Sequence, residues 1–320
     1  MMNRLRVAVG AVLALFVQGV SAQDYPVRAI TLVVAFPPGG PTDVAARMLG
    51  EQLAEVLKQP VVIANRPGAA GRIGSQMVES APADGYTLLL ANTVTHGMLS
   101  AATKPPPYDP VKGFTPVMRL FGYQALMVCS AKLPVRNVEE LVAYARSRPN
   151  GLVYASSGVG TGAHFAGEMF AAMKKVRAVH VPFSGSAPAM QAVLAGDVDC
   201  SFDGLARAQI DAGKVRPIAT LGLKRDPHYP DVPTLDEAGA AGFDLGLWQG
   251  LLAPAGLRSE VLATLERGLQ QALKAPELQE RLKLLGLYPL PGTGADLQQA
   301  ILRDISRYQR LARELAITFE

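Results

Sequence analysis

The sequence predicts an α/β protein of two lobes, each a mostly parallel sheet flanked by helices. Three observations lead to this prediction: short apolar runs alternate with amphipathic ones, the pattern starts afresh in mid-chain, and 49% of the 320 residues are hydrophobic. Continuous runs of Val, Ile and Leu between helices are typical of parallel strands buried on both faces. A chain of this length can bury one large core or two medium ones.

The first unit opens with the apolar run ITLVVAF, which predicts a buried strand. The expected elements are strands at 30–36, 60–65 and 86–92, with helices at 42–58 and 73–81. A proline-rich segment at 104–117 interrupts the alternation. Because proline lacks the backbone N–H that a sheet needs, we interpret this segment as a crossing to a second unit.

The second unit repeats the same pattern. Strands are expected at 123–130, 152–156, 178–183, 197–202 and 216–223, with helices at 137–148, 161–174 and 185–196. One more strand, at 245–254, and helices at 258–275, 276–286 and 294–317 complete the chain. We therefore predict lobe one at 23–120 plus 221–320, with lobe two inserted at 121–220.

The first 22 residues predict a cleavable signal peptide. Arg4 and Arg6 precede a short apolar run from Val7 to Val17, and small residues follow up to Ala22, where cleavage is expected. An apolar run of ~11 residues is too short for a membrane span, which needs about 20. Removing the two arginines lowers the formal net charge from +4 to +2. With no basic stripe in the sequence, this argues against a nucleic-acid partner.

The sequence contains no motif for binding a metal ion or a nucleotide. The histidines are widely spaced, and there is neither an H-E-x-x-H nor a C-x-x-C motif. The segment GVGTG is not a dinucleotide-binding motif, because it lacks the full G-x-G-x-x-G pattern and an acidic residue about 20 positions further on. We therefore expect no metal and no cofactor. Cys129 and Cys200 each fall in a predicted strand, where they form either a disulfide or two buried free thiols.

Three polar segments follow predicted strands: FPPGGPTD, ANTVTH and ASSGVGTGAH. Because ligands of open α/β sheets bind beyond the carboxyl ends of the strands, facing lobes place a cleft there. In the first and last segments glycines precede a Thr that starts a helix, and helix N-termini favour anions. The plainer alternative makes Thr42 and Thr161 ordinary N-caps. The candidate ligand contacts are Phe36, Pro38, Gly39, Gly40, Thr42, Asn92, Ser156, Ser157, Gly158, Thr161, His164 and Asp203.

A serine-dependent hydrolase is the alternative from another functional class. Ser156 or Ser157 would be the nucleophile and His164 the base. The sequence has no G-x-S-x-G elbow around either serine, which argues against this alternative. Asp203 has two further interpretations, since it can cap the next helix or pin a hinge.

The chain resembles the Bug-type receptors, the extracytoplasmic solute-binding proteins of tripartite tricarboxylate transporters. The motifs that carry the resemblance include "VVAFPPGGPTDVAARML", "NRPGAAGRIG", "ADGYTLLLAN", "YASSGVGTGAHFAGEMF", "VHVPFSGSAPAM" and "GLLAPAG". The resemblance implies a type II-like periplasmic binding protein, or Venus flytrap, that closes on a small carboxylate without catalysis. It also implies a periplasmic location, a monomer, and membrane subunits of a transporter as partners. In that family the loops matching 37–43 and 156–164 contact the ligand.

Four features depart from the family pattern: Arg72, Val159, a shortened segment after Asp203, and Gln249 in place of an aromatic residue. The identity of the acid therefore stays open. A receptor that now serves a signalling partner instead of transport is a further alternative that the sequence leaves open.

Overall fold

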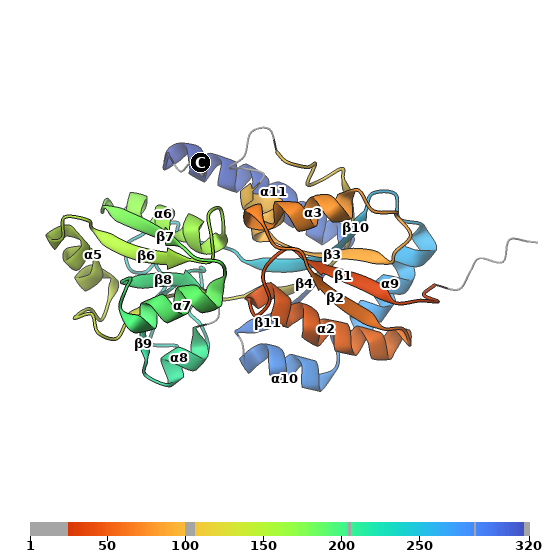
Figure 1. Cartoon of the computed structure of the whole chain (residues 1–320), viewed down its shortest axis with the longest axis horizontal. Helices are drawn as coiled ribbons and strands as arrows, with labels where there is room; N and C mark the ends of the chain where they lie inside the picture. Colours follow the sequence, from red (N-terminus) through yellow and green to blue (C-terminus); the bar gives the residue numbers. More distant parts are fainter. Residues whose placement is uncertain (1–24, 100–105, 204–205, 285, 317–320) are drawn as a thin grey trace, which may run out of the picture.

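The computed structural model describes residues 25–99, 106–203, 206–284 and 286–316. The chain forms two lobes side by side, each built on one sheet with helices on both faces (Figure 1). The predicted two-lobed α/β fold is confirmed. The predicted signal peptide, residues 1–22, lies outside the described residues.

The sheet of lobe one has six strands in the order β11-β4-β10-β3-β1-β2. Their bounds are β1 (Ile30–Val34), β2 (Val61–Asn65), β3 (Thr87–Asn92), β4 (Phe114–Tyr123), β10 (Trp248–Pro254) and β11 (Leu287–Thr293). β1 is parallel to β2 and β3, whereas β10 is antiparallel to β3 and β4, and β11 to β4.

The sheet of lobe two has the order β7-β6-β8-β5-β9. Its strands are β5 (Leu126–Ser130), β6 (Leu152–Ser156), β7 (Ala178–Pro182), β8 (Cys200–Asp203) and β9 (Val215–Thr220). β6 is parallel to β7 and β8, but β5 is antiparallel to β8 and β9.

Both sheets are therefore mixed, with two strands of lobe one, β10 and β11, and one strand of lobe two, β5, running against the others. The reason is the crossing between lobes. Strands β3 and β8 end at the boundary between the lobes, so β10 and β5, which enter from the other lobe, start there and run the opposite way.

Helices cover both faces of each sheet. In lobe one, α2 (Pro41–Leu57), α9 (Ser259–Ala272) and α10 (Pro276–Leu284) pack on one face. On the other lie α3 (Arg72–Glu79), η2 (Val94–Met98) and α11 (Gly294–Glu314), with the short turn η1 (Ala69–Gly71) beside them. In lobe two, α5 (Val138–Ser147) and α6 (Gly162–Lys174) pack on one face, and α7 (Ser186–Ala195) and α8 (Arg207–Asp211) lie toward the other.

Cys129 and Cys200 form a disulfide. They lie directly opposite each other on the antiparallel strands β5 and β8, in the core beneath α5 and α6. The alternative of two free thiols is therefore excluded by the structure.

The chain passes between the lobes at two places. Gln124 and Ala125 alone separate β4 from β5. On the return, the segment 221–247 packs on lobe two before β10 begins, with Leu235 and Phe243 in the core of the second sheet. This packing favours a return crossing near residue 246 over the predicted boundary at 221.

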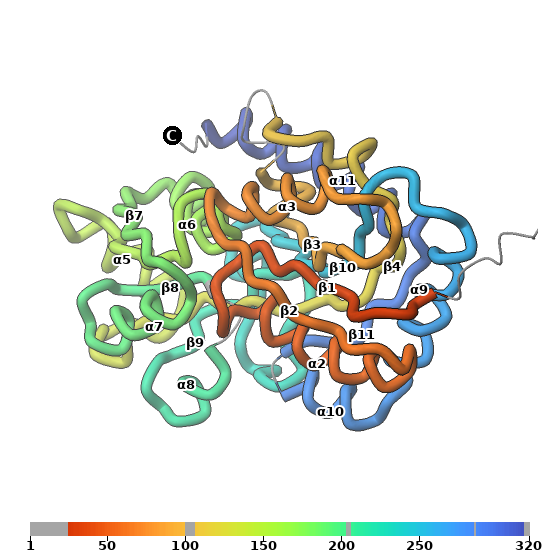
Figure 2. The backbone as a smooth tube through the Cα atoms, turned by 45° about the vertical axis from the view of Figure 1, so that its right-hand side comes forward, coloured from red at the N-terminus to blue at the C-terminus, as the bar shows by residue number. Residues whose placement is uncertain are grey.

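The C-terminal helix α11 reaches across both lobes. Its end lies over lobe two in both views (Figures 1 and 2). Tyr308 of α11 packs edge-on against Phe165 of α6 and donates its hydroxyl proton to the carbonyl of Leu245. Within the described residues, no helix is long and apolar enough to span a membrane.

Candidate functional site

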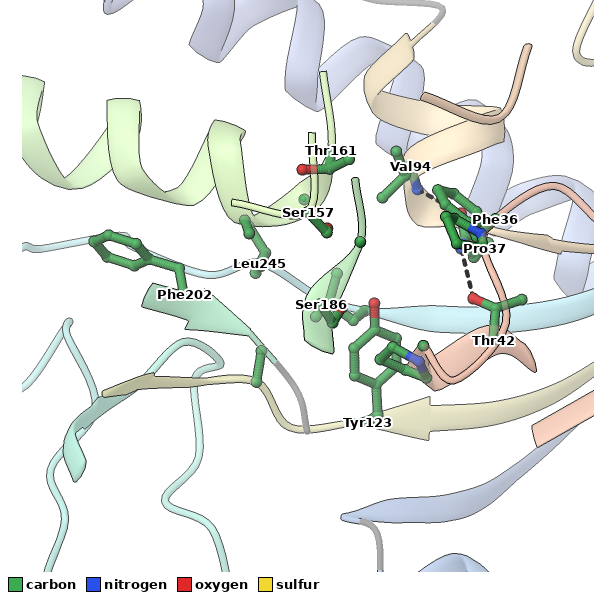
Figure 3. Close-up of a pocket in the computed structure, with 18 of the residues that line it drawn as sticks. Phe36, Pro37, Thr42, Val94, Tyr123, Ser157, Thr161, Ser186, Phe202 and Leu245 are labelled. Atoms are coloured by element: carbon green, nitrogen blue, oxygen red, sulfur yellow. Dashed lines mark hydrogen bonds between the residues drawn. The ribbon is translucent and has the colours of Figure 1, made fainter. Parts of the chain in front are cut away.

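A pocket of about 670 Å³, measured out to open solvent, lies between the two lobes at the carboxyl ends of their parallel strands. We call it the cleft pocket. It is lined by Phe36, Pro37, Pro38, Gly40, Pro41, Thr42, Asn92, Val94, Tyr123, Ala125, Ser157, Thr161, Gly162, Ala163, Gly185, Ser186, Phe202, Leu245 and Leu247. In Figure 3, Ser157, Thr161 and Ser186 of lobe two face Phe36, Pro37 and Thr42 of lobe one.

The wall of lobe one is the start of α2. The helix begins at Pro41 with Gly40 as its N-cap, so the prediction that Thr42 starts the helix is one residue late. Proline suits this first position because its ring presets the helical φ and no N–H is lost from the helix. Gly40 provides no side-chain cap, and the first-turn N–H groups of α2 therefore stay available at the pocket wall.

Asp43 holds the lobe-one wall in place. Its carboxylate accepts hydrogen bonds from the Gly39 N–H at 2.9 Å, from Arg47 at 2.9 and 3.0 Å, and from the Asn65 amide at 2.9 Å. Burial raises the pKa of Asp43, but the hydrogen bonds from Arg47, Gly39 and Asn65 more than offset this and hold the pKa below its usual value. Gly39 has a φ of +83°, lies outside the pocket lining, and shapes the turn through this bond.

Asn92 joins β3 to α2 at the floor of the pocket. Its amide donates to the Thr42 hydroxyl at 3.1 Å, while its Oδ1 accepts from the N–H groups of Val94 and Thr95. These bonds fix the Thr42 hydroxyl at the pocket wall (Figure 3).

The wall of lobe two is the start of α6. Thr161 is its N-cap, but the hydroxyl donates to the Gly158 carbonyl at 2.7 Å and caps no helix N–H. Behind the wall, Ser156 Oγ lies 2.6 Å from His180 Nε2 and bonds both the N–H and the carbonyl of Gly158. Ser156, Gly158 and His164 thus lie outside the pocket lining and support the loop.

His164 and His180 stack with their rings 3.8 Å apart. Nδ1 of His164 accepts a hydrogen bond from the Gly160 N–H at 3.0 Å. Burial lowers the pKa of both histidines to about 4, so both are neutral at pH 7. Neither brings a positive charge to the cleft.

The serine–histidine pair of the hydrolase alternative is not assembled as predicted. The histidine that Ser156 contacts is His180, and this serine is fully buried. Ser157 is the serine that lines the pocket. Asp203 ends β8, but its side chain lies outside the described residues, so its role stays a prediction. Arg72 and Val159 are exposed and do not line the pocket.

A third helix, α7, also begins at the pocket, although no site residue was predicted there. Gly185 is its N-cap, and both Gly185 and Ser186 line the pocket. The signal was present, since FSGSAP places Gly and Ser before a helix as the other two loops do. Tyr123, Ala125, Leu245 and Leu247 were missed because they come from the crossings between the lobes.

Glycines let the lobes come close around this pocket. A Cβ added at Gly160 would lie 3.0 Å from the Cβ of Ala70, and one at Gly162 would lie 3.4 Å from Val94. At the other rim, a Cβ on Gly185 would lie 3.7 Å from Pro37. Each pair joins the two lobes.

The chemistry of the cleft pocket suits an anion. The N-termini of α2, α6 and α7 converge on it, and none of the described residues lining it carries a charge. Each helix N-terminus stabilises an anion by ~0.3–1 kcal/mol when exposed and up to ~2 kcal/mol when partly buried. The hydroxyls of Thr42, Ser157 and Ser186 add further donors.

A second, larger cavity, about 1840 Å³ when measured out to open solvent in the same way, lies on the other side of the crossing strands. We call it the hinge-side cavity. It shares Tyr123, Ala125, Leu245 and Leu247 with the cleft pocket. Its basic lining residues are Arg119, Arg207, Lys224, Arg225, Lys283, Arg303 and Arg307.

Two lobes with a pocket between their strand ends define the fold of a periplasmic binding protein. Comparison with known proteins gives the same fold. The structure is similar to that of the periplasmic binding protein BugD, with a TM-score of 0.87 and 34% identity over 92% of this chain and 99% of BugD. A model of the family described as "Tripartite tricarboxylate transporter family receptor" matches residues 45–317. The chain belongs to this receptor family.

Two solved structures of similar chains hold acids. MatC from Rhodopseudomonas palustris with bound malate has a TM-score of 0.85 and 35% identity over 90% of this chain and 99% of MatC. R. palustris Rpa4515 with adipate has a TM-score of 0.87 and 34% identity over 92% of this chain and 99% of that one.

Proposed function

We propose that this protein is an exported receptor that captures a small carboxylate in the cleft pocket and delivers it to the membrane subunits of a tripartite transporter. It acts in the periplasm as a monomer, after cleavage near Ala22, and catalyses no reaction. The observation that carries the proposal is the convergence of the N-termini of α2, α6 and α7 on one uncharged pocket. The malate and adipate held by its relatives support it.

The carboxylate accepts hydrogen bonds from first-turn N–H groups on both lobes, so it favours the arrangement in which the lobes touch. Thr42 and Asn92 supply polar contacts from lobe one, and Ser157 and Ser186 supply them from lobe two, where the Thr161 hydroxyl holds the loop through the Gly158 carbonyl. Phe36, Pro38 and Phe202 provide apolar walls. Micromolar affinity corresponds to about −8 kcal/mol, within reach of a few charge-assisted hydrogen bonds and these apolar contacts.

A thermal-shift screen tests this proposal. The purified protein is unfolded and refolded to remove any retained ligand, then heated with a panel of mono-, di- and tricarboxylates. An acid at 100 times its dissociation constant stabilises the folded state by ~2.7 kcal/mol, which raises Tm by several degrees. A response confined to one class of acids supports the receptor, whereas a well-folded protein that responds to no acid contradicts it.

The hydrolase alternative makes a different prediction. A serine hydrolase is labelled covalently by a fluorophosphonate probe, and labelling is lost when the nucleophile is replaced. We expect no labelling of the purified protein. Labelling that disappears in Ser157→Ala would contradict the receptor proposal.

A further inference from the structure

Gln249 is a polar side chain next to the cleft pocket that the proposed function does not use. It lies in β10, at the centre of the lobe-one sheet, and is completely buried. Neither Nε2 nor Oε1 of its amide has a hydrogen-bond partner among the described residues. A buried polar group without a partner costs roughly 1–3 kcal/mol, so such an amide calls for a physical explanation.

The register of the sheet places Gln249 beside Asn92 of the pocket floor, directly behind the residues that line the cleft pocket. Gln249 pairs with Asn92 on β3 and with Phe121 on β4, and paired residues of antiparallel strands project from the same face. The Asn92 side chain bonds Thr42 of α2, so Gln249 lies on the α2 face, below the N-terminus of that helix. Asn92, Thr42 and the nearby Leu247 all line the pocket.

The polar groups around Gln249 bond one another and do not bond its amide. Oδ1 of Asn92 accepts two backbone N–H groups, and its amide nitrogen donates to the Thr42 hydroxyl. The facing side chains on β4 and β10 are apolar, with Phe121 and Leu251 both in the core beneath α2. No described residue partners the Gln249 amide, and the adjoining cleft pocket is where a ligand can supply the missing partner.

We propose that Gln249 reads a hydroxyl group on the bound acid and so makes the receptor selective for hydroxylated carboxylates. The inference rests on the proposed function, since it names the class of acid taken by the same pocket. The amide needs both an acceptor for its N–H and a donor for its carbonyl oxygen. A hydroxyl offers both, a second carboxylate offers only acceptors at neutral pH, and a methylene offers neither.

Matched pairs of acids test this selectivity by calorimetry: succinate with malate, glutarate with 2-hydroxyglutarate, and benzoate with 4-hydroxybenzoate. The refolded wild-type protein is expected to bind the hydroxylated member of at least one pair about tenfold more tightly, the effect of one satisfied hydrogen bond in a buried site. In Gln249→Leu the ratio falls to about one, while affinity for the unsubstituted acid changes less than about threefold.

Stability separates ligand recognition from a structural role. Removing an unpartnered amide leaves the ligand-free Gln249→Leu protein at least as stable as the wild type. The control is Gln279→Leu, which removes an amide that bonds the Leu273 carbonyl far from the pocket. Gln249→Met gives the same readout if the leucine variant fails to fold.

The outcomes are distinct. An unchanged hydroxyl preference in Gln249→Leu overturns the inference, and so does an equal loss of affinity for both members of a pair together with a lower Tm. A wild-type protein that binds acids without preferring hydroxylated ones also overturns it and leaves the receptor proposal standing. Failure of the wild type to bind any of the acids contradicts the receptor proposal itself.

Discussion

The two walls of the cleft pocket are built by different means. In lobe one, a buried carboxylate collects hydrogen bonds from a loop N–H, an arginine and an asparagine, all through Asp43. In lobe two, neutral groups hold the loop of the wall in place. Ser156 bonds His180, and His164 accepts a hydrogen bond from the Gly160 N–H. The lobe-one wall therefore depends on one charge, and the lobe-two wall depends on histidines staying neutral.

The largest expected effect comes from removing the charge in lobe one. Asp43→Ala leaves the Gly39 N–H and the Asn65 amide without their acceptor and deprives Arg47 of its ion pair, so we expect a loss of about 3 kcal/mol in the free energy of unfolding. Urea denaturation measures it. Glu51→Ala on the same helix breaks an exposed ion pair with Arg281 and should cost less than about 0.5 kcal/mol. Equal losses in the two variants would contradict the role given to Asp43.

The second-largest effect is expected from a bulky side chain placed between the two walls of the pocket. Gly40 has a φ of −82°, which any residue adopts, and a Cβ there would lie 4.0 Å from the Ser186 hydroxyl of lobe two. Gly40→Leu is therefore expected to fold normally and to lose about 100-fold in acid affinity by calorimetry, as overpacking of 2–3 kcal/mol implies. Gly40→Ala makes only ordinary contacts and should lose much less. Full affinity in Gly40→Leu would place the ligand elsewhere.

Acid should weaken the lobe-two wall first. His164 and His180 have a folded-state pKa of about 4, below the ordinary 6.5, so unfolding takes up protons between these values and stability falls as pH drops from 6.5 to 4. Glu168 also faces His180 and moderates the effect. Asp304 acts in the opposite direction, because burial raises its pKa to about 6.

Melting curves from pH 7.5 to 4 measure this dependence. In His180→Gln the fall in Tm between pH 7.5 and 4 should be smaller by a few degrees. In His228→Gln, which changes an exposed histidine, the fall in Tm should be the same as in the wild type. A profile of His180→Gln that matches the wild type would show that the stacked histidines do not govern acid stability.

The smallest expected effect is at the lobe-two rim. Thr161→Ala removes the hydroxyl that bonds the Gly158 carbonyl in the pocket wall, so affinity should fall about fivefold, the effect of losing this single hydrogen bond from the loop. Stability should change little, and Thr264→Ala on α9 is a matched control for the loss of a hydroxyl. A larger fall than in Gly40→Leu would reverse the order proposed for the two walls.

The elements with strong apolar patterns were predicted well from the sequence. Strands β1, β2, β3 and β6 and the long helices fall where the periodicity placed them. β4 was missed, because the proline-rich segment 104–117 was interpreted as the crossing, whereas the chain crosses at Gln124 and Ala125, between β4 and β5. β11 was missed as well, since LYPLPGT contains two prolines and is largely exposed at the sheet edge.

The candidate site was predicted in part for a similar reason. Phe36, Gly40, Thr42, Asn92 and Thr161 follow strands or start helices, and they line the pocket together with Pro38 and Ser157. Tyr123 and Leu247 reach the pocket only through the pairing of strands distant in sequence, which no local pattern encodes. The buried state of Gln249 and the lack of partners for its amide likewise emerge only from the packed sheet.

A crystal structure of the refolded protein with the tightest-binding acid tests the central claim most directly. We predict that the carboxylate lies in the cleft pocket, within hydrogen-bond distance of first-turn N–H groups of α2 and of α6 or α7. An acid bound instead among the arginines and lysines of the hinge-side cavity, with the cleft pocket unchanged, would contradict the account.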